Sequence, residues 1–267
     1  MEKKIQKIGG YLEVDKDGFI VKKVSEDRFQ KKWKPVIEET KNVYIKYFGD
    51  ILNSVYIRGS VAEGLAIDEI SDLDTIAIVN LPKEQINTEW RNEFNKKIIT
   101  EYPFVRRVEI FVVTPERAVN KEKGTHIILK TQAVCIYGKD IFDNIPKLKP
   151  GKECAFIYKD IKNDIEKNIH SFKNEQHQDI KEYKDKCSFI MKRIIRTGFE
   201  LVMEREQKYT RDLYTCYESF SKYYPEKKNE MYKTLEMAIN PTDDSRIIIK
   251  LLNDWLIFLS KEIEKVL

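Results

Sequence analysis

The first half of the chain mixes two spacings of hydrophobic residues. Short runs rich in β-branched and aromatic residues predict strands, because such side chains suit a half-buried sheet. Longer segments with apolar residues three and four positions apart predict helices. The predicted strands are 54–58, 73–79 and 105–113, with 127–137 read as a helical turn that leads into a strand. The predicted helices are 26–48, with a kink or a new start at Pro35, the short 61–66, and 83–101.

The second half is helical in pattern almost throughout. Helices are expected near 153–175, 178–206, 210–223, 227–239 and 244–266. The segment 143–152 carries two prolines and a glycine, which break regular structure and mark a boundary. We therefore expect an α+β fold with two domains, one formed by residues 1–146 and an all-α helical bundle formed by residues 147–267.

Composition narrows the class of protein without identifying it. The chain has 267 residues, of which 42% are hydrophobic and 34% charged, as in ordinary globular proteins. Its net charge of +4 is weak for this length, so nucleic acid is a less favoured partner. None of the four cysteines forms a C-x-x-C pair, and no run is apolar enough for a signal peptide or a membrane span. We expect a cytoplasmic protein with free thiols and no membrane partner.

A pair of carboxylates and a Gly-Ser turn suggest a site for a metal and phosphates. Asp72 and Asp74 begin the second predicted strand, and alternate residues of a strand point to the same face. Two adjacent carboxylates repel each other unless a cation lies between them, and magnesium prefers such oxygen ligands. Gly59 and Ser60 follow the first strand, where backbone N–H groups and a hydroxyl can bind phosphate oxygens. Replacing either aspartate by asparagine is expected to abolish catalysis and, by removing repulsion, to raise stability slightly.

A third carboxylate, Glu109, lies inside an apolar strand, where an unpaired charge is costly. It is the candidate general base. The alternatives are a structural ion pair with Arg106 or Arg107, and an edge-strand glutamate that faces water.

These residues resemble a known signature. A strand, Gly59-Ser60, eleven further residues, Asp72-Leu73-Asp74 and a second strand are similar to the motif of the DNA polymerase beta-like nucleotidyltransferase superfamily. An acidic residue on a later strand, here Glu109, completes its triad. The layout is closest to the streptomycin- and spectinomycin-type aminoglycoside nucleotidyltransferases. The resemblance implies a small mixed β-sheet nucleotidyltransferase domain flanked by helices, followed by the helical bundle.

The resemblance also implies roles for single residues. Asp72 and Asp74 would bind Mg²⁺, and Glu109 would be the general base or a third metal ligand. Gly59 and Ser60 would contact the phosphates of ATP or another nucleoside triphosphate. In relatives a basic residue of the helical half reaches the triphosphate, and Lys208 and Arg211 are the candidates here; the alternative is that both are ordinary surface cations. This chain departs from relatives in carrying Arg58 before the glycine, and Glu63 where many have a basic residue.

The function expected from the resemblance is transfer of a nucleoside monophosphate, AMP from Mg-ATP, to a hydroxyl of a small molecule, with release of pyrophosphate. An aminoglycoside-like antibiotic is the first acceptor to consider. Two alternatives remain open. The acceptor could be a macromolecule, either a protein hydroxyl as in toxin–antitoxin systems or an RNA 3′ end, or the chain could be a non-catalytic nucleotide-binding regulator.

Overall fold

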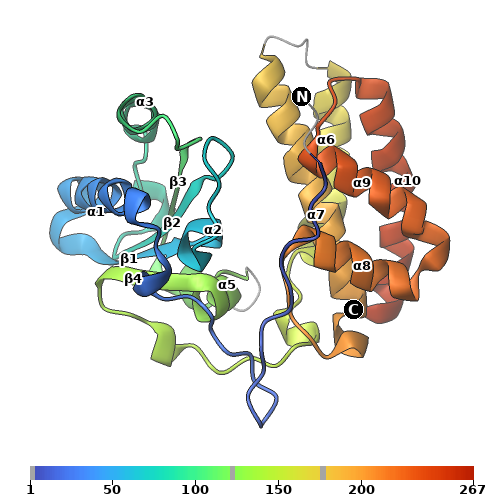
Figure 1. Ribbon diagram of the computed structural model, residues 1–267, viewed down its shortest axis with the longest axis horizontal. Helices are drawn as coiled ribbons and strands as arrows, with labels where there is room; N and C mark the ends of the chain where they lie inside the picture. The colour runs from blue at the N-terminus through green and yellow to red at the C-terminus, as the bar shows by residue number, and fades with distance from the viewer. Residues whose placement is uncertain (1–3, 121–123, 175–178) are drawn as a thin grey trace. The chain divides into compact units, whose positions relative to one another are not determined.

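The structure is a computed structural model of the chain and describes residues 4–120, 124–174 and 179–267. The chain divides into two compact units (Figure 1). One is Val21–Leu148, which contains the sheet, and we call it the sheet unit. The other combines Met1–Ile20 with Lys149–Leu267, and we call it the helical unit.

The sheet unit is built on four strands in the order β3-β2-β1-β4. The strands are β1 (Leu52–Arg58), β2 (Leu73–Val79), β3 (Val108–Val113) and β4 (Ala133–Gly138). The central strand β1 pairs antiparallel with both β2 and β4, whereas β2 and β3 run parallel. The sheet is therefore mixed, as predicted.

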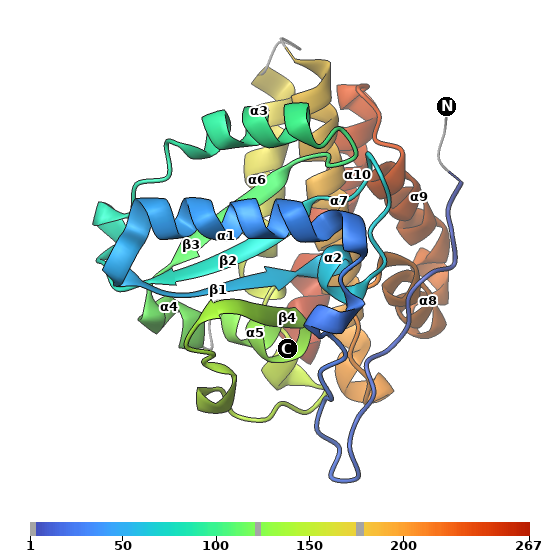
Figure 2. The same ribbon diagram turned by 60° about the vertical axis from the view of Figure 1, so that its left-hand side comes forward.

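Helices cover both faces of this sheet. On one face α1 and α3 cover the strands, and in Figure 2 α1 lies over the sheet. The opposite face packs on α4 and α5 around Ile76, Ile78 and Leu129. The short α2 follows β1. These helices are α1 (Lys34–Phe48), α2 (Gly59–Glu63), α3 (Arg91–Glu101), α4 (Pro115–Val119) and α5 (Thr125–Gln132).

The two longer predicted helices and one predicted strand of the sheet unit are shorter than expected. The predicted helix 83–101 is a 3₁₀ turn (Lys83–Gln85) followed, only from Arg91, by α3, because the Asn87 side chain accepts the Glu89 N–H at 2.8 Å and forms a local turn instead of helix. The predicted helix 26–48 consists of two 3₁₀ turns and then α1, with Pro35 in its first turn, where a missing N–H costs nothing. The predicted strand 105–113 begins only at Val108, so Arg106 and Arg107 precede it in irregular backbone. The ambiguous stretch 127–137 is the end of α5 followed by β4.

The helical unit is a bundle in which α7 packs against α6, α8, α9 and α10. Trp255 of α10 is fully buried, and its indole N–H donates to Thr234 Oγ1 of α9 at 2.7 Å. The helices are α6 (Tyr158–Asn174), α7 (Ile180–Glu206), α8 (Leu213–Tyr223), α9 (Lys228–Ile239) and α10 (Ser245–Val266). The expectation of an α+β fold with a sheet unit and an all-helical unit is thus confirmed.

The N-terminal segment, which we expected to belong with the sheet, groups with the helical unit instead. The Leu12 N–H donates to the carbonyl of Tyr209 at 2.8 Å, and the Gly10 N–H donates to Asp212 Oδ2 at 2.8 Å. Thr210 Oγ1 donates to the Gly10 carbonyl at 2.8 Å. These bonds join segments about two hundred residues apart in sequence, which no local pattern reveals. Among the described residues, no helix is both long and apolar enough to span a bilayer.

Candidate functional site

The strand register brings two of the predicted carboxylates side by side. Asp74 of β2 pairs with Glu109 of β3 on one side and with Arg58 of β1 on the other. Register partners in neighbouring strands point to the same face, so these three side chains form a row across the sheet. Asp72, two residues before Asp74, starts the same face. The structure therefore gathers Asp72, Asp74 and Glu109 at one end of one sheet face.

Gly59 permits the close approach of the turn to this row. Its φ is +71°, in the left-handed region that disfavours side chains. A Cβ added here would lie 2.4 Å from Asp74 Oδ2. Two independent features thus favour glycine at this position: the left-handed backbone conformation and the lack of space beside the Asp74 carboxylate.

Ser60, predicted to contact phosphate, donates from its hydroxyl to Ser71 Oγ at 3.2 Å. Ser71 Oγ in turn accepts the Ile67 N–H at 2.8 Å. These bonds tie the start of α2 to the residue immediately before Asp72. Ser60 therefore lies beside the carboxylates, while its contact with a phosphate stays a prediction.

Two successive arginines hold Asp72. Arg106 binds it with a fork, Nε to Oδ1 at 2.8 Å and Nη2 to Oδ2 at 2.9 Å. Arg107 Nε donates to Oδ2 at 3.2 Å. Neighbours in a regular strand would point to opposite faces. Both reach the same carboxylate because they precede β3 rather than belonging to it.

The other two carboxylates are also paired with arginines. Arg58 Nη2 lies 2.8 Å from Asp74 Oδ1, and Arg107 Nη2 contacts Glu109 Oε1. The pair with Arg107 is the structural alternative considered for Glu109. These ion pairs change one expectation: Asp72→Asn removes attraction to two guanidiniums as well as repulsion between carboxylates, so a gain in stability is no longer expected.

A hydrogen-bonded pair of hydroxyls on the opposite face of the sheet holds the backbone of Glu109. Thr75, which points away from the carboxylates, donates from Oγ1 to the Glu109 carbonyl at 2.6 Å. The Tyr44 hydroxyl lies 2.6 Å from Thr75 Oγ1, and complete burial raises the pKa of Tyr44 far above its usual range. Tyr44 therefore stays protonated, and this buried chain of hydroxyls fixes the backbone of β3 against β2.

The chemistry of the donors fits magnesium, which prefers carboxylate oxygens. The placement of Asp72, Asp74 and Glu109 on one face fits it too. Their oxygens, however, are turned toward arginines, and no three acidic, histidine or cysteine side chains within the described ranges are grouped as a metal site. A metal ion at these residues would therefore compete with the arginines for the carboxylate oxygens.

Lys208 and Arg211 lie in the helical unit, in the segment between α7 and α8. The ammonium of Lys208 is 4.7 Å from the ring centre of Tyr11, and the guanidinium of Arg211 is 5.2 Å from that of Phe156. Both cations thus pack on aromatic rings of their own unit. Their part in nucleotide binding stays a prediction.

Arg58, Arg106 and Arg107 are residues of the site that the sequence did not predict. The sequence pointed to Arg58 only as a departure from relatives, and to Arg106 and Arg107 only as possible partners for Glu109. A pair of arginines immediately before a strand that carries a glutamate is the pattern that could have indicated them.

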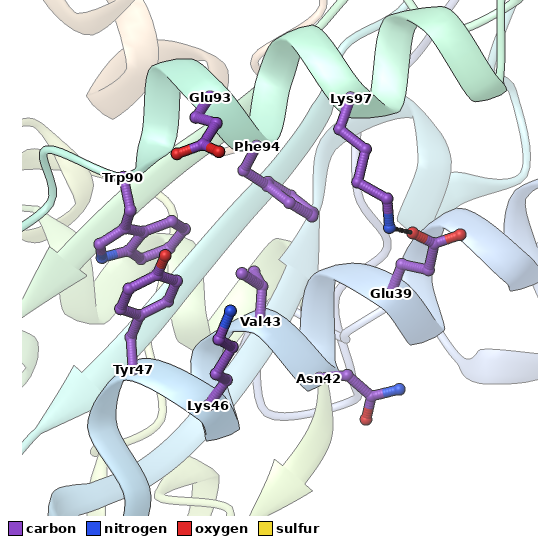
Figure 3. A pocket seen from close by; sticks show the side chains of 9 residues that line it. All are labelled: Glu39, Asn42, Val43, Lys46, Tyr47, Trp90, Glu93, Phe94 and Lys97. Carbon is purple, nitrogen blue, oxygen red and sulfur yellow. Dashed lines mark hydrogen bonds and ion pairs between the residues drawn. The ribbon is translucent and has the colours of Figure 1, made fainter.

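A surface pocket of the sheet unit lies on the other side of the sheet, between α1 and α3 (Figure 3). Its volume is about 320 Å³. Tyr47 stacks on Trp90 with ring centres 4.6 Å apart, and Lys97 Nζ lies 2.6 Å from Glu39 Oε2. The pocket is lined by residues of α1 and α3 and by Trp90, and Asp72, Asp74 and Glu109 are not among its lining residues.

The sequence matches no protein-family model and no curated protein. A solved structure does match: spectinomycin adenyltransferase AAD(9) from Enterococcus faecialis, crystallised with ATP and spectinomycin. The two chains are 16% identical with a TM-score of 0.50, and the match covers 84% of this chain and 98% of the other.

This chain has a nucleotidyltransferase-like fold. The match supports that part of the predicted resemblance. At 16% identity it shows the fold alone, so the donor, the acceptor and the roles of single residues are matters for a proposal.

Proposed function

We propose that this chain is a metal-dependent nucleotidyltransferase that moves AMP from ATP to a hydroxyl of a small molecule and releases pyrophosphate. The observation that carries the proposal is the grouping of Asp72, Asp74 and Glu109 on one sheet face beside the Gly59 turn. The solved structure of similar fold contains ATP and spectinomycin, which supports ATP as donor and an aminoglycoside-like antibiotic as the first acceptor to test.

In the proposed reaction the acceptor hydroxyl attacks the α-phosphorus, the bond to the β-phosphate oxygen breaks, and pyrophosphate leaves. Asp72 and Asp74 would hold magnesium, which when bound neutralises phosphate charge and aligns the displacement. Glu109 would take the hydroxyl proton or act as a third ligand. Its side chain is 38% exposed, so an acceptor can reach it from solvent. Gly59, Ser60, Lys208 and Arg211 would bind the triphosphate.

The test is an acceptor screen with purified protein, magnesium and labelled ATP, against aminoglycosides, tRNA and cell lysate. Labelling of a small molecule, with transfer lost in Asp74→Asn and the melting temperature within a few degrees of wild type, would support the proposal. Glu109→Gln should keep ATP binding and lose turnover if Glu109 is the base.

Other outcomes would redirect the assignment. Labelling only of protein or RNA would indicate a macromolecular acceptor. If ATP binds but nothing is labelled with any nucleoside triphosphate, the chain is a nucleotide-binding regulator. Full transfer by Asp72→Asn or Asp74→Asn would overturn the metal assignment.

A further inference from the structure

The carboxylates of the candidate site share it with an equal number of guanidiniums. Arg106 and Arg107 take both oxygens of Asp72, Arg107 also contacts Glu109, and Arg58 contacts Asp74. The side chain of Asp72 is only 15% exposed. Three negative charges collected at one end of a sheet would repel strongly, and the arginines offset this repulsion when no metal is present.

Magnesium and the guanidiniums would compete for the same carboxylates. Both Asp72 oxygens already accept N–H bonds from guanidiniums, and a metal ion would place a second positive charge against the same atoms. Release of one arginine from its carboxylate would relieve this repulsion between positive charges. Arg107 can leave most readily because its side chain is 43% exposed.

A released arginine needs a new anionic partner nearby. A triphosphate carries more negative charge than one magnesium ion neutralises, and the planar guanidinium fork matches phosphate oxygens as well as carboxylate oxygens. Magnesium and the triphosphate bind as one complex. The arginine would therefore lose its carboxylate partner to the metal and gain a phosphate partner in the same binding event.

We propose that Arg58 and Arg107 exchange partners: they neutralise Asp74, Asp72 and Glu109 without metal, and they bind the triphosphate when magnesium takes the carboxylates. This inference rests on the proposed function, and it assigns to the two arginines a nucleotide-positioning role. It predicts that the two residues oppose binding of the metal alone and favour binding of the metal–nucleotide complex.

The experiment measures two affinities of Arg58→Gln and Arg107→Gln without any turnover. Mn²⁺ alone is titrated by electron paramagnetic resonance, and the magnesium complex of the non-reactive α,β-methylene analogue of ATP is titrated by calorimetry. Each variant should bind Mn²⁺ about two- to fivefold more tightly, because a competing ion pair is gone. Each should bind the magnesium–nucleotide complex about tenfold more weakly, because a charge-assisted fork is lost.

Arg117→Gln is the matched control for loss of one positive charge on the same face. Its guanidinium lies 5.5 Å from the ring centre of Phe111, two residues beyond Glu109. It should change both affinities far less than the other variants. Equal shifts in Arg117→Gln would show a general charge effect and overturn the exchange.

The other combinations of the two affinities also test the proposal. Tighter binding of both ligands would make the arginines mere counter-ions of the carboxylates, and weaker or unchanged binding of both, with normal melting, would make them structural; either result overturns the proposal. If the wild type binds Mn²⁺ but no nucleotide, the proposed function fails as well, and this failure is recognised in the wild type before any variant is compared.

Discussion

Gly59 offers a sharp test of the site geometry, because its hydrogen faces the carboxylate of Asp74. The perturbation is Gly59→Ala. The new methyl group would lie 2.4 Å from Asp74 Oδ2, whereas ordinary contact begins at 3.4 Å, so the oxygen must move by about 1 Å. Rotation of the aspartate side chain would relieve this overlap and would disturb the contact of Asp74 with Arg58.

The two costs of this substitution differ in kind. The positive φ of Gly59 costs an alanine about 1–2 kcal/mol of folding free energy. Displacement of a catalytic group by about 1 Å can lower the rate about a hundredfold. We therefore expect a modest loss of stability and a much larger loss of transfer, with weakened Mn²⁺ binding.

Gly49→Ala is the matched control in the same unit. Gly49 also has a positive φ, +49°, but an added Cβ meets nothing within 4 Å. It should lower the midpoint of urea unfolding as Gly59→Ala does and leave transfer and Mn²⁺ affinity unchanged. Equal activity of the two variants, measured by pyrophosphate release, would refute the placement of Asp74 in the reaction.

Three further predictions concern the helical unit. Glu200 is buried, and its carboxylate accepts the N–H groups of residues 156–158. Glu200→Gln turns an amide N–H₂ toward one of these N–H groups, so it should lower the free energy of unfolding in urea by about 1–3 kcal/mol. An unchanged unfolding midpoint would contradict this bonding. Burial raises the pKa of the Cys216 thiol to about 12, and only the thiolate reacts with iodoacetamide. At pH 8 mass spectrometry should therefore find Cys216 unmodified until the protein unfolds, whereas the partly exposed Cys135 should be modified earlier. Lys208→Ala and Arg211→Ala should each weaken ATP binding several-fold by calorimetry, and unchanged affinity would leave them as ordinary surface cations.

Much of the sheet unit could be predicted because its signals are local. The run 73–79 is a short segment rich in apolar and β-branched residues between polar flanking residues, which is typical of a strand buried on both faces, and it forms β2 within the same limits. The shared face of Asp72 and Asp74 follows from the period of a strand alone. The position of Glu109 beside Asp74 does not, because it depends on the parallel register of β2 and β3.

The features that the sequence could not predict depend on contacts between distant segments. The N-terminal segment lies on the helical unit because Gly10 and Leu12 bond to the turn before α8. The irregular backbone at Arg106 and Arg107, which aims both at Asp72, reads as strand in a pattern of apolar residues. From the sequence one can see that these arginines are positively charged, but not which carboxylate each of them contacts.

One sheet face carries both a buried apolar part of the unit and the proposed reaction site. Along β2 the side chains after Asp74 on that face are Ile76 and Ile78, which are buried under α4 and α5. The face thus changes from charged to apolar within one alternation, where the helices begin to cover it. Asp72, Asp74 and Glu109 remain partly exposed, whereas Ile76 and Ile78 are buried, so the proposed metal and triphosphate would approach this face at its carboxylate end. Extending the charge inward, as in Ile76→Asp, would bury an unpaired carboxylate and destabilise the unit without enlarging the site.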